Sequence, residues 1–329
     1  MINSVITLEV NPEIAPVLFG QLNQNLRQIS EELDVNLSAR GNTLHISGDE
    51  ESVSLALMVL ETLRDQVAQG IVPGPHEIKY ALDLARDDQR LTPEEADLST
   101  EIIAVTSRGK KIFPRTLGQK RYINAIRHNL LTFGIGPAGT GKTYLAVAMA
   151  VAALQSKEVY RIILTRPAVE AGEKLGFLPG DLQEKVDPYL RPLNDALFDI
   201  LGGELYQRYM EKRIIEIAPL AYMRGRTLDD SFIILDEAQN TTPEQMKMFL
   251  TRMGFGSKVI VNGDITQVDL PKGSVSGLTE VATIFQDVPG ITVVTLGHKD
   301  VVRHELVQKI IRAYDDYDKK RGKGQKGML

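Results

Sequence analysis

The chain has 329 residues, a formal net charge of −5 and no cysteine. Its length favours two domains with a sizeable core, and the lack of cysteine excludes disulfides, a thiol nucleophile and cysteine-ligated zinc or iron–sulfur sites. Because the chain as a whole is acidic, any contact with nucleic acid must come from a local basic patch.

Residues 1–70 are predicted to form a small α+β domain. Helical spacing indicates two short helices interrupted at Gly20 and a longer helix over Glu50–Gln69. The predicted strands are Ser4–Val10, Asn36–Ala39 and Leu44–Ser47. The order β-α-α-β-β-α resembles a KH-like RNA-binding module, in which a GXXG loop clamps the nucleic-acid backbone. That loop here reads Gly20-Gln21-Leu22-Asn23 and lacks the second glycine, so RNA binding and a packing or assembly role both stay open.

Residues 71–100 are interpreted as a linker. Pro73, Gly74 and Pro75 break regular structure directly after the first domain. A short helix is expected over His76–Arg86, followed by a polar stretch that reaches Thr100. We therefore expect a linker that carries a tethered helix.

Residues 101–317 are predicted to form an α/β domain. Its predicted strands are the apolar runs Leu131–Ile135, Arg161–Thr165, Phe232–Leu235, Lys258–Asn262 and Ile291–Thr295. Strands that alternate with helical segments are typical of a parallel sheet with helices on both faces. Residues 318–329 are rich in glycine and lysine and are expected to be a disordered basic tail. Without a bilayer-length apolar run or a signal-peptide pattern, the chain is expected to be cytoplasmic, with no membrane partner.

A basic cluster precedes the phosphate-loop strand. Its members are Arg108, Lys110, Lys111 and Arg115, around a hairpin turn that we predict at Ser107–Lys110. Such a cluster suits contacts with RNA phosphates, although a solvated hairpin has the same charge pattern.

The segment Gly136-Pro137-Ala138-Gly139-Thr140-Gly141-Lys142-Thr143 matches the phosphate-binding loop pattern at every fixed position. It lies between a predicted strand and a helix-forming run, the context that this loop requires. Glycines let backbone N–H groups close around phosphate oxygens, and the helix N-terminus adds a partial positive charge. Lys142 is expected to reach the β- and γ-phosphates of ATP, and the Thr143 hydroxyl to bind Mg²⁺.

The apolar strand Phe232–Leu235 ends in two carboxylates, Asp236 and Glu237. Parallel sheets place ligand sites outside the carboxyl ends of their strands. Asp236 is expected to help hold Mg²⁺, and Glu237 to orient and deprotonate the attacking water. The pattern is common by itself, and its pairing with the phosphate loop makes it specific.

Three more side chains are assigned to the nucleotide. Gln267, after the strand Lys258–Asn262, is expected to sense the γ-phosphate and position water. Gln119 precedes the phosphate-loop strand and is expected to read adenine, because an amide can bind both N6 and N7 of that base. Arg303 is expected to act as an arginine finger on the transferred phosphoryl group. Their ordinary alternatives are a turn residue, a solvated helix start and a surface ion pair.

Together these motifs resemble the PhoH family of ATPases over roughly Glu101–Tyr317. The most distinctive match, Thr165–Gly180, is similar to the Ia region of superfamily 1 helicases, and Gly263–Gln267 is similar to their motif III. The N-terminal module fits the branch with a KH-like domain rather than the branch with a PIN nuclease. The resemblance implies a RecA-like P-loop NTPase fold, ATP hydrolysis, RNA metabolism, ring-shaped oligomers and association with a ribosome-maturation endoribonuclease.

The chain has room for one motor domain. A superfamily 1 helicase places ATP between two RecA-like domains, but only about ninety residues follow Glu237, too few for a second domain. A closed ring of heterologous interfaces would let a neighbour supply the missing wall, with Arg303 reaching the adjacent nucleotide. A hexamer is favoured, mostly by the family resemblance.

The leading interpretation is a Mg²⁺-dependent ATPase that acts as an oligomeric ring in RNA metabolism or ribosomal RNA maturation, with RNA helicase activity as one form. The alternative is a nucleotide-switched assembly factor that recruits an endoribonuclease without translocating on RNA. A small-molecule kinase with the same loop is disfavoured, because Glu237 beside Asp236 would activate water wastefully.

Overall fold

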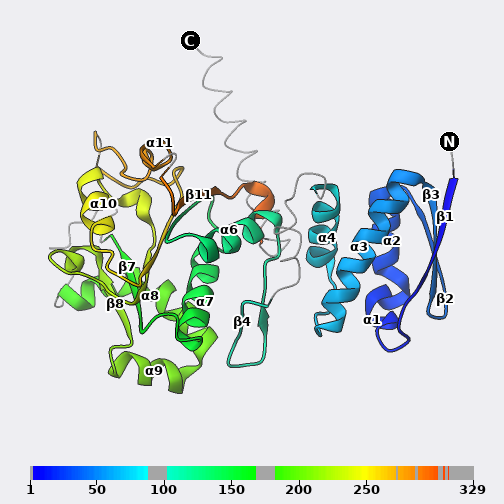
Figure 1. Cartoon of the computed structure of the whole chain (residues 1–329), viewed down its shortest axis with the longest axis horizontal. Coiled ribbons are helices and arrows are strands. Elements are labelled where there is room, and N and C mark those ends of the chain that lie inside the picture. The colour runs from blue at the N-terminus through cyan, green and yellow to red at the C-terminus, as the bar shows by residue number, and fades with distance from the viewer. Residues whose placement is uncertain are drawn as a thin grey trace, which may run out of the picture.

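The computed structural model describes residues 3–87, 102–167, 182–271, 273–285 and 288–302, together with Val307 and Ile310. In Figure 1 the elements before residue 88 gather in one lobe and those after residue 101 in a larger one. The expected linker residues 88–100 and the basic tail 318–329 lie outside the described residues. Within the described part of the chain, no helix is long and apolar enough to cross a membrane.

The N-terminal lobe has the predicted element order. Its strands form an antiparallel sheet in the order β1-β3-β2, with β1 at Asn3–Glu9, β2 at Asn36–Arg40 and β3 at Thr43–Asp49. Its helices are α1 (Ala15–Phe19), η1 (Gln21–Asn23), α2 (Gln24–Leu33) and α3 (Glu50–Ala68). Gly20 separates α1 from η1 with a φ of 74°, a value that favours glycine. Asp49 caps α3 by accepting a hydrogen bond from the Ser52 N–H.

The helix that we expected within the linker belongs to the N-terminal lobe. This helix, α4 (Pro75–Asp87), packs on α3 and buries Ile78, Ala81, Leu82 and Ala85 in the same core. It is therefore packed rather than tethered. The Arg86 guanidinium also donates to the Glu32 carbonyl at the end of α2.

The larger lobe is built on a six-stranded parallel sheet in the order β11-β6-β10-β9-β7-β8. Its strands are β6 (Leu131–Ile135), β7 (Arg161–Arg166), β8 (Ile215–Pro219), β9 (Ser231–Leu235), β10 (Lys258–Gly263) and β11 (Ile291–Thr295). Five of them were predicted to within one residue at either end. Among the described strands, the sixth, β8, pairs with β7 alone and forms an edge of the sheet.

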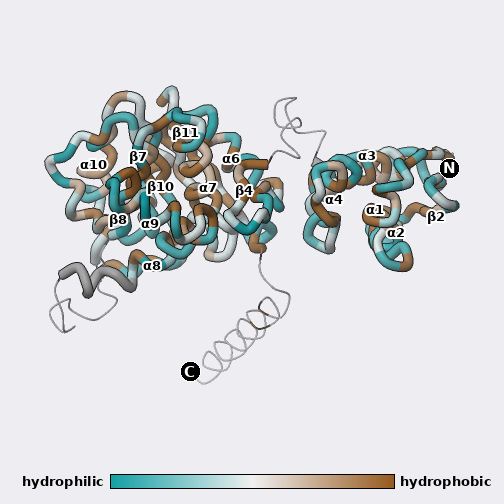
Figure 2. The backbone as a smooth tube through the Cα atoms, turned by 90° about the horizontal axis from the view of Figure 1, so that it is seen from below, coloured by the Kyte–Doolittle hydropathy of each residue, from teal (hydrophilic) through white to brown (hydrophobic). Residues whose placement is uncertain are grey.

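Helices cover both faces of this sheet, which confirms the predicted α/β architecture. One face packs against α6 (Leu117–His128), α7 (Lys142–Gln155) and α8 (Leu182–Leu201). The other packs against α10 (Pro243–Leu250) and α11 (Val281–Ile284). The short helices α9 (Gly203–Glu211), η4 (Leu220–Met223), η5 (Ala238–Asn240) and η6 (His298–Asp300) complete the lobe. Figure 2 shows apolar segments, α7 among them, in its interior.

The predicted hairpin turn is present. It joins β4 (Ala104–Val105) to β5 (Lys111–Ile112), and the Ser107 N–H donates to the Ile200 carbonyl of α8. Arg108 and Lys110 are exposed at this turn, whereas Lys111 is half-buried and its ammonium donates to the Gln69 carbonyl after α3. The hairpin thus contacts both lobes and leaves two of its cations free to face solvent.

Candidate nucleotide-binding site

The phosphate-binding loop joins β6 to α7 at the carboxyl edge of the sheet. A side chain at Gly136 would place its Cβ 2.5 Å from the Leu296 carbonyl oxygen, so only glycine fits there. Gly141, with a φ of 80°, turns the chain into α7. Close packing and a left-handed turn thus explain why glycine stands at these two positions of the motif.

Lys142 is folded over its own loop. Its ammonium donates to the Gly136 carbonyl at 2.6 Å, to the Pro137 carbonyl at 3.0 Å and to the Thr140 hydroxyl at 3.3 Å. Burial lowers the pKa of this ammonium, while the carboxylates of Asp264, Asp236 and Glu237 act in the opposite direction. The ammonium of Lys142 is thus held by neutral oxygen atoms. It lies where the phosphates of a nucleotide would bind.

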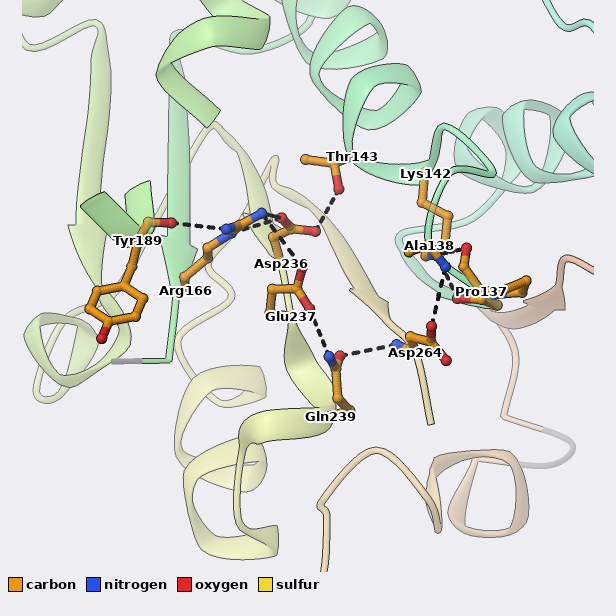
Figure 3. Close-up of polar contacts among 11 residues, drawn as sticks. Pro137, Ala138, Lys142, Thr143, Arg166, Tyr189, Asp236, Glu237, Gln239 and Asp264 are labelled. Carbon is orange, nitrogen blue, oxygen red and sulfur yellow. Dashed lines mark hydrogen bonds and ion pairs between the residues drawn. The ribbon is translucent and has the colours of Figure 1, made fainter. Parts of the chain in front are cut away.

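Asp236 joins the phosphate-binding loop to β7. Its Oδ1 accepts a hydrogen bond from the Thr143 hydroxyl at 2.7 Å, and its Oδ2 accepts from Arg166 Nε at 2.8 Å and from the Arg166 Nη2 group (Figure 3). The carboxylate is nearly buried. Arg166 also donates to the Tyr189 carbonyl of α8 at 2.9 Å. The two predicted metal ligands, Thr143 and Asp236, are therefore in direct contact.

These two oxygen ligands fit Mg²⁺. That ion prefers hard oxygen donors and usually takes only one or two from the protein, because it keeps several waters and binds substrate phosphates. Among the described residues there is no cluster of three or more acidic or histidine side chains that would suit a metal cage. The donor set therefore matches a nucleotide-bound Mg²⁺ rather than a permanent structural metal.

Glu237 is oriented by two neighbours. Its Oε2 accepts a hydrogen bond from Gln239 Nε2 at 2.7 Å, and its Oε1 lies 3.7 Å from Arg166 Nη2. The backbone of Glu237 has a φ of 55°, which is uncommon outside glycine and is typical of functional turns. Its side chain is 46% exposed, so one carboxylate can meet both these partners and a water molecule.

The hydrogen bonds around Glu237 continue to the end of β10. The Gln239 side-chain oxygen accepts from the Asp264 N–H at 3.0 Å, and Asp264 Oδ2 accepts from the Ala138 N–H at 3.2 Å. Gln239 and Asp264 thus connect Glu237, the predicted general base, to the phosphate-binding loop. Gln267 follows with an exposed side chain, and its N–H donates to the Asp264 carbonyl.

A cavity of about 270 Å³ brings the predicted residues together. It is lined by parts of the phosphate-binding loop and by the ends of β9 and β10, including Lys142, Thr143, Asp236, Glu237 and Gln267. Three separate sequence motifs therefore meet at one edge of the sheet, as expected for parallel strands.

Gln119 lies beside the loop but is not free. Its Oε1 accepts from the Arg115 N–H at 2.7 Å and its Nε2 donates to the Thr140 carbonyl at 2.9 Å. The side chain is 4% exposed. Both ends of the amide bind backbone in this structure, so adenine could be read by Gln119 only if one of these bonds were exchanged. A second cavity of about 240 Å³ opens next to Gln119, Gly141 and Tyr144.

Arg303 lies outside the described residues, as do residues 168–181 of the long motif. The chain that precedes Arg303 is described and contacts the site. The Val302 N–H donates to the Gly139 carbonyl at 3.0 Å, and Asp300 accepts hydrogen bonds from the Thr116 hydroxyl at 2.6 Å and the Gly118 N–H at 3.0 Å. This segment is thereby attached to the phosphate-binding loop of its own chain.

Four positioning residues had no role assigned from the sequence. They are Arg166, Gln239, Asp264 and Asp300. Arg166, Gln239 and Asp264 stand within or beside the quoted motifs, at the ends of predicted strands, so their place at the carboxyl edge was the available signal. Asp300 has no such signal, because Thr116 and Gly118, which it joins to its own segment, lie more than 180 residues away in the sequence.

Comparison with known proteins places this site in a family. The family model described as PhoH-like protein matches residues 111–315. A PhoH-like protein of Bacillus subtilis is 54% identical over 305 residues, which cover 93% of this chain and 95% of that protein. A PhoH-like protein of Synechocystis is 50% identical over 93% of this chain and 92% of its own length. Protein PhoH of Escherichia coli K12 is 49% identical over 205 residues, which cover 62% of this chain and 58% of that protein.

Proposed function

The chain belongs to the PhoH family, and on that premise we propose that it is a Mg²⁺-dependent ATP hydrolase that acts as an oligomeric ring on RNA or ribonucleoprotein. The observation that carries the proposal is the meeting of Lys142, Asp236 and Glu237 around one cavity at the carboxyl edge of a parallel sheet. A phosphate cradle, a metal-binding carboxylate and a base are the parts that phosphate-anhydride hydrolysis needs.

Each side chain then has a defined task. The loop N–H groups and the Lys142 ammonium bind the β- and γ-phosphates, for which Lys142 gives up its carbonyl partners in the loop. Thr143 and Asp236 would hold Mg²⁺, and the ion would offset phosphate charge. Glu237, fixed by Gln239, accepts the proton of the attacking water, and Gln267 helps to place that water.

The adenine base of ATP is assigned to the second cavity, beside Gly141. Tyr144 and Phe113 line it, and the Arg115 guanidinium lies 5.7 Å from the centre of the Phe113 ring. Aromatic walls suit a planar nucleobase. Gln119, which bridges Arg115 and Thr140, sets the spacing between this cavity and the phosphate-binding loop.

RNA metabolism or ribosomal RNA maturation is the proposed setting, with cytoplasmic localisation and an RNA helicase as one form of the activity. The alternative function, a nucleotide-switched factor that recruits an endoribonuclease, uses the same ATP site. One assay separates the two: ATP turnover with and without RNA, on protein of measured oligomeric state. RNA-stimulated turnover supports action on RNA, whereas RNA-insensitive turnover with nucleotide-dependent partner binding supports the assembly factor. Absence of any ATP turnover would overturn both.

Replacing Lys142 by alanine is expected to weaken nucleotide binding and to lower turnover by roughly 10²–10³-fold, because a preorganised cation is lost from the phosphates. The measurement is steady-state phosphate release together with titration of a fluorescent ATP analogue. Lys157→Ala, at an exposed position after α7, is the matched control and should leave both unchanged. Normal turnover in Lys142→Ala protein would refute the site assignment.

Neutralising Arg108 and Lys110 is expected to weaken RNA binding and to reduce the slope of log affinity against log salt by roughly one to two, because each phosphate contact contributes about one to that slope. The double variant should affect RNA binding more than Lys111→Gln, since the Lys111 ammonium is committed to the Gln69 carbonyl. A variant that neutralises all four cations, Arg108, Lys110, Lys111 and Arg115, completes the series. An unchanged affinity and salt slope in that variant would remove the hairpin from the RNA surface.

A further inference from the structure

A second large cavity lies away from the candidate nucleotide-binding site. It is a groove of about 710 Å³ on the face of the sheet that carries α10 and α11. Apolar side chains dominate its lining, among them Leu130, Met246, Leu250, Ile284 and Val288. Leu130 and Ile284 are 59% and 58% exposed. An apolar groove of this size is unusual on a protein surface without a partner and marks an interaction site.

A segment of the chain has the complementary pattern. Beyond Val302 the sequence reads RHELVQKIIRAYDDY, from Arg303 to Tyr317. Its apolar residues recur at the spacing of one helical face, at Leu306, Val307, Ile310, Ile311, Tyr314 and Tyr317. Val307 and Ile310 are described, have helical backbone and are 40% and 47% exposed. The sequence pattern thus predicts an amphipathic helix, and the structure leaves Val307 and Ile310 on its apolar side exposed.

Asp300 and Val302, which precede the segment, lie on the other side of the sheet from the groove. Val302 is bound to Gly139, and Asp300 is bound to Thr116 at the start of α6, so the exit lies at the carboxyl edge on the α6 side of the sheet. The groove lies on the opposite face and extends to the amino ends of β6 and β11, at Leu131 and Ile291.

The reach of the chain excludes its own groove for the start of the segment. The four residues from Val302 to Leu306 span at most about 14 Å when fully extended. One five-residue strand spans about 17 Å, and the chain would also have to pass around the edge of the sheet. The apolar side of the segment therefore cannot begin in the groove of its own chain, whereas a neighbouring copy can present its groove directly.

We propose that the groove between α10 and α11 receives the apolar side of residues 306–317 of a second copy of this chain. Helix-in-groove binding of this kind uses apolar anchors at i, i+3, i+4 and i+7 spacing, which Val307, Ile310, Ile311 and Tyr314 provide. Donor segment and acceptor groove are different surfaces, so the interface is heterologous and generates a ring when the rotation closes. The inference goes beyond the proposed function, because it identifies the surfaces that assemble the ring rather than the reaction.

The lack of cysteine in the chain permits a direct test. One full-length protein carries Ile284→Cys in the groove, and a second, size-tagged protein carries Ile310→Cys in the segment. After subunit exchange and mild oxidation, a disulfide between the two proteins is expected, at least tenfold faster than with Gln308→Cys, which places the thiol on the polar side of the helix. A third protein with both Ile284→Cys and Ile310→Cys reports any link within one chain.

Each outcome bears on the proposal. A link between chains that is selective for position 310 over position 308 supports it. A link that forms only within the doubly substituted chain would show that the segment folds back, and equal rates at the two positions would show random collision; either overturns it. Ile310→Glu should also shift the native mass from the oligomer to smaller species while the thermal unfolding of each lobe stays unchanged. An unchanged oligomer mass in that variant overturns the proposal as well. None of these readouts requires ATP turnover, so failure here is distinguishable from failure of the proposed ATPase.

Discussion

Replacing Glu237 by glutamine is expected to slow ATP hydrolysis by about 10²–10⁴-fold while ATP binding persists, because general-base catalysis contributes a factor of that size. Glutamine keeps the shape of the side chain, and its amide oxygen can still accept the hydrogen bond that Gln239 donates at 2.7 Å. It cannot take a proton from water. The ATP-bound form should therefore accumulate, which rapid filtration with labelled ATP would measure.

The control for this variant is Glu204→Gln, which removes an exposed carboxylate in the first turn of α9, outside the site. Its turnover should equal that of the unchanged protein. If Glu237→Gln protein fails to bind ATP, the carboxylate has a structural role, because it also lies 3.7 Å from Arg166, which holds Asp236. Thermal unfolding of both variants separates loss of the base from loss of the local fold.

The hydrophobic pattern of the sequence predicted most strands of the larger sheet, because helices bury both faces of that sheet. Strands β6 and β9 are buried throughout and read as continuous apolar runs in the sequence. The missed strand, β8, is an edge strand with Glu216 at its second position, and that carboxylate is paired with Arg226 outside the sheet. Its alternating pattern is short and ends at Pro219, so periodicity alone did not distinguish it from a loop.

The nucleotide site was predictable where local motifs carry it. The phosphate-binding loop and the Asp236–Glu237 pair follow strands, and strand order brings them together. The links between motifs were not predictable, because Asp264 to Ala138 and Asp300 to Thr116 are contacts between distant parts of the sequence. Gln119 shows the same limit. Its place in the sequence suggested a contact with the adenine base, whereas its amide binds the backbone of Arg115 and Thr140.

The described structure also supports the argument for an incomplete ATP site. After β9, the next two strands, β10 and β11, join the same sheet as β6, so within the described residues they do not begin a second motor domain. Residues at the carboxyl edge of this sheet line one side of the candidate site. The opposite wall has to come from residues outside the described ranges or from a neighbouring copy, and Arg303 is the proposed residue for it.

Replacing Arg303 by alanine is expected to lower turnover by about 10³–10⁵-fold while ATP binding and the oligomer persist, which is the contribution of an arginine finger in related chemistry. The preceding residue, Val302, is bound to Gly139 of the same chain. An in-cis arrangement is therefore the direct competitor of the proposed trans arrangement. Turnover of the single variant cannot separate them, because either arrangement loses the same charge.

Mixing Arg303→Ala protein with Lys142→Ala protein separates the two arrangements. If Arg303 acts on the neighbour's nucleotide, random exchange in a ring pairs an intact loop with an intact arginine at about a quarter of the interfaces, so turnover should recover to about a quarter of normal. If Arg303 acts in cis, every chain carries one defect and no interface is repaired. Differently tagged subunits must be shown to exchange, and each variant alone sets the background. Absence of recovery despite exchange would reject the shared site, and with it the need for a neighbour to complete the ATP pocket.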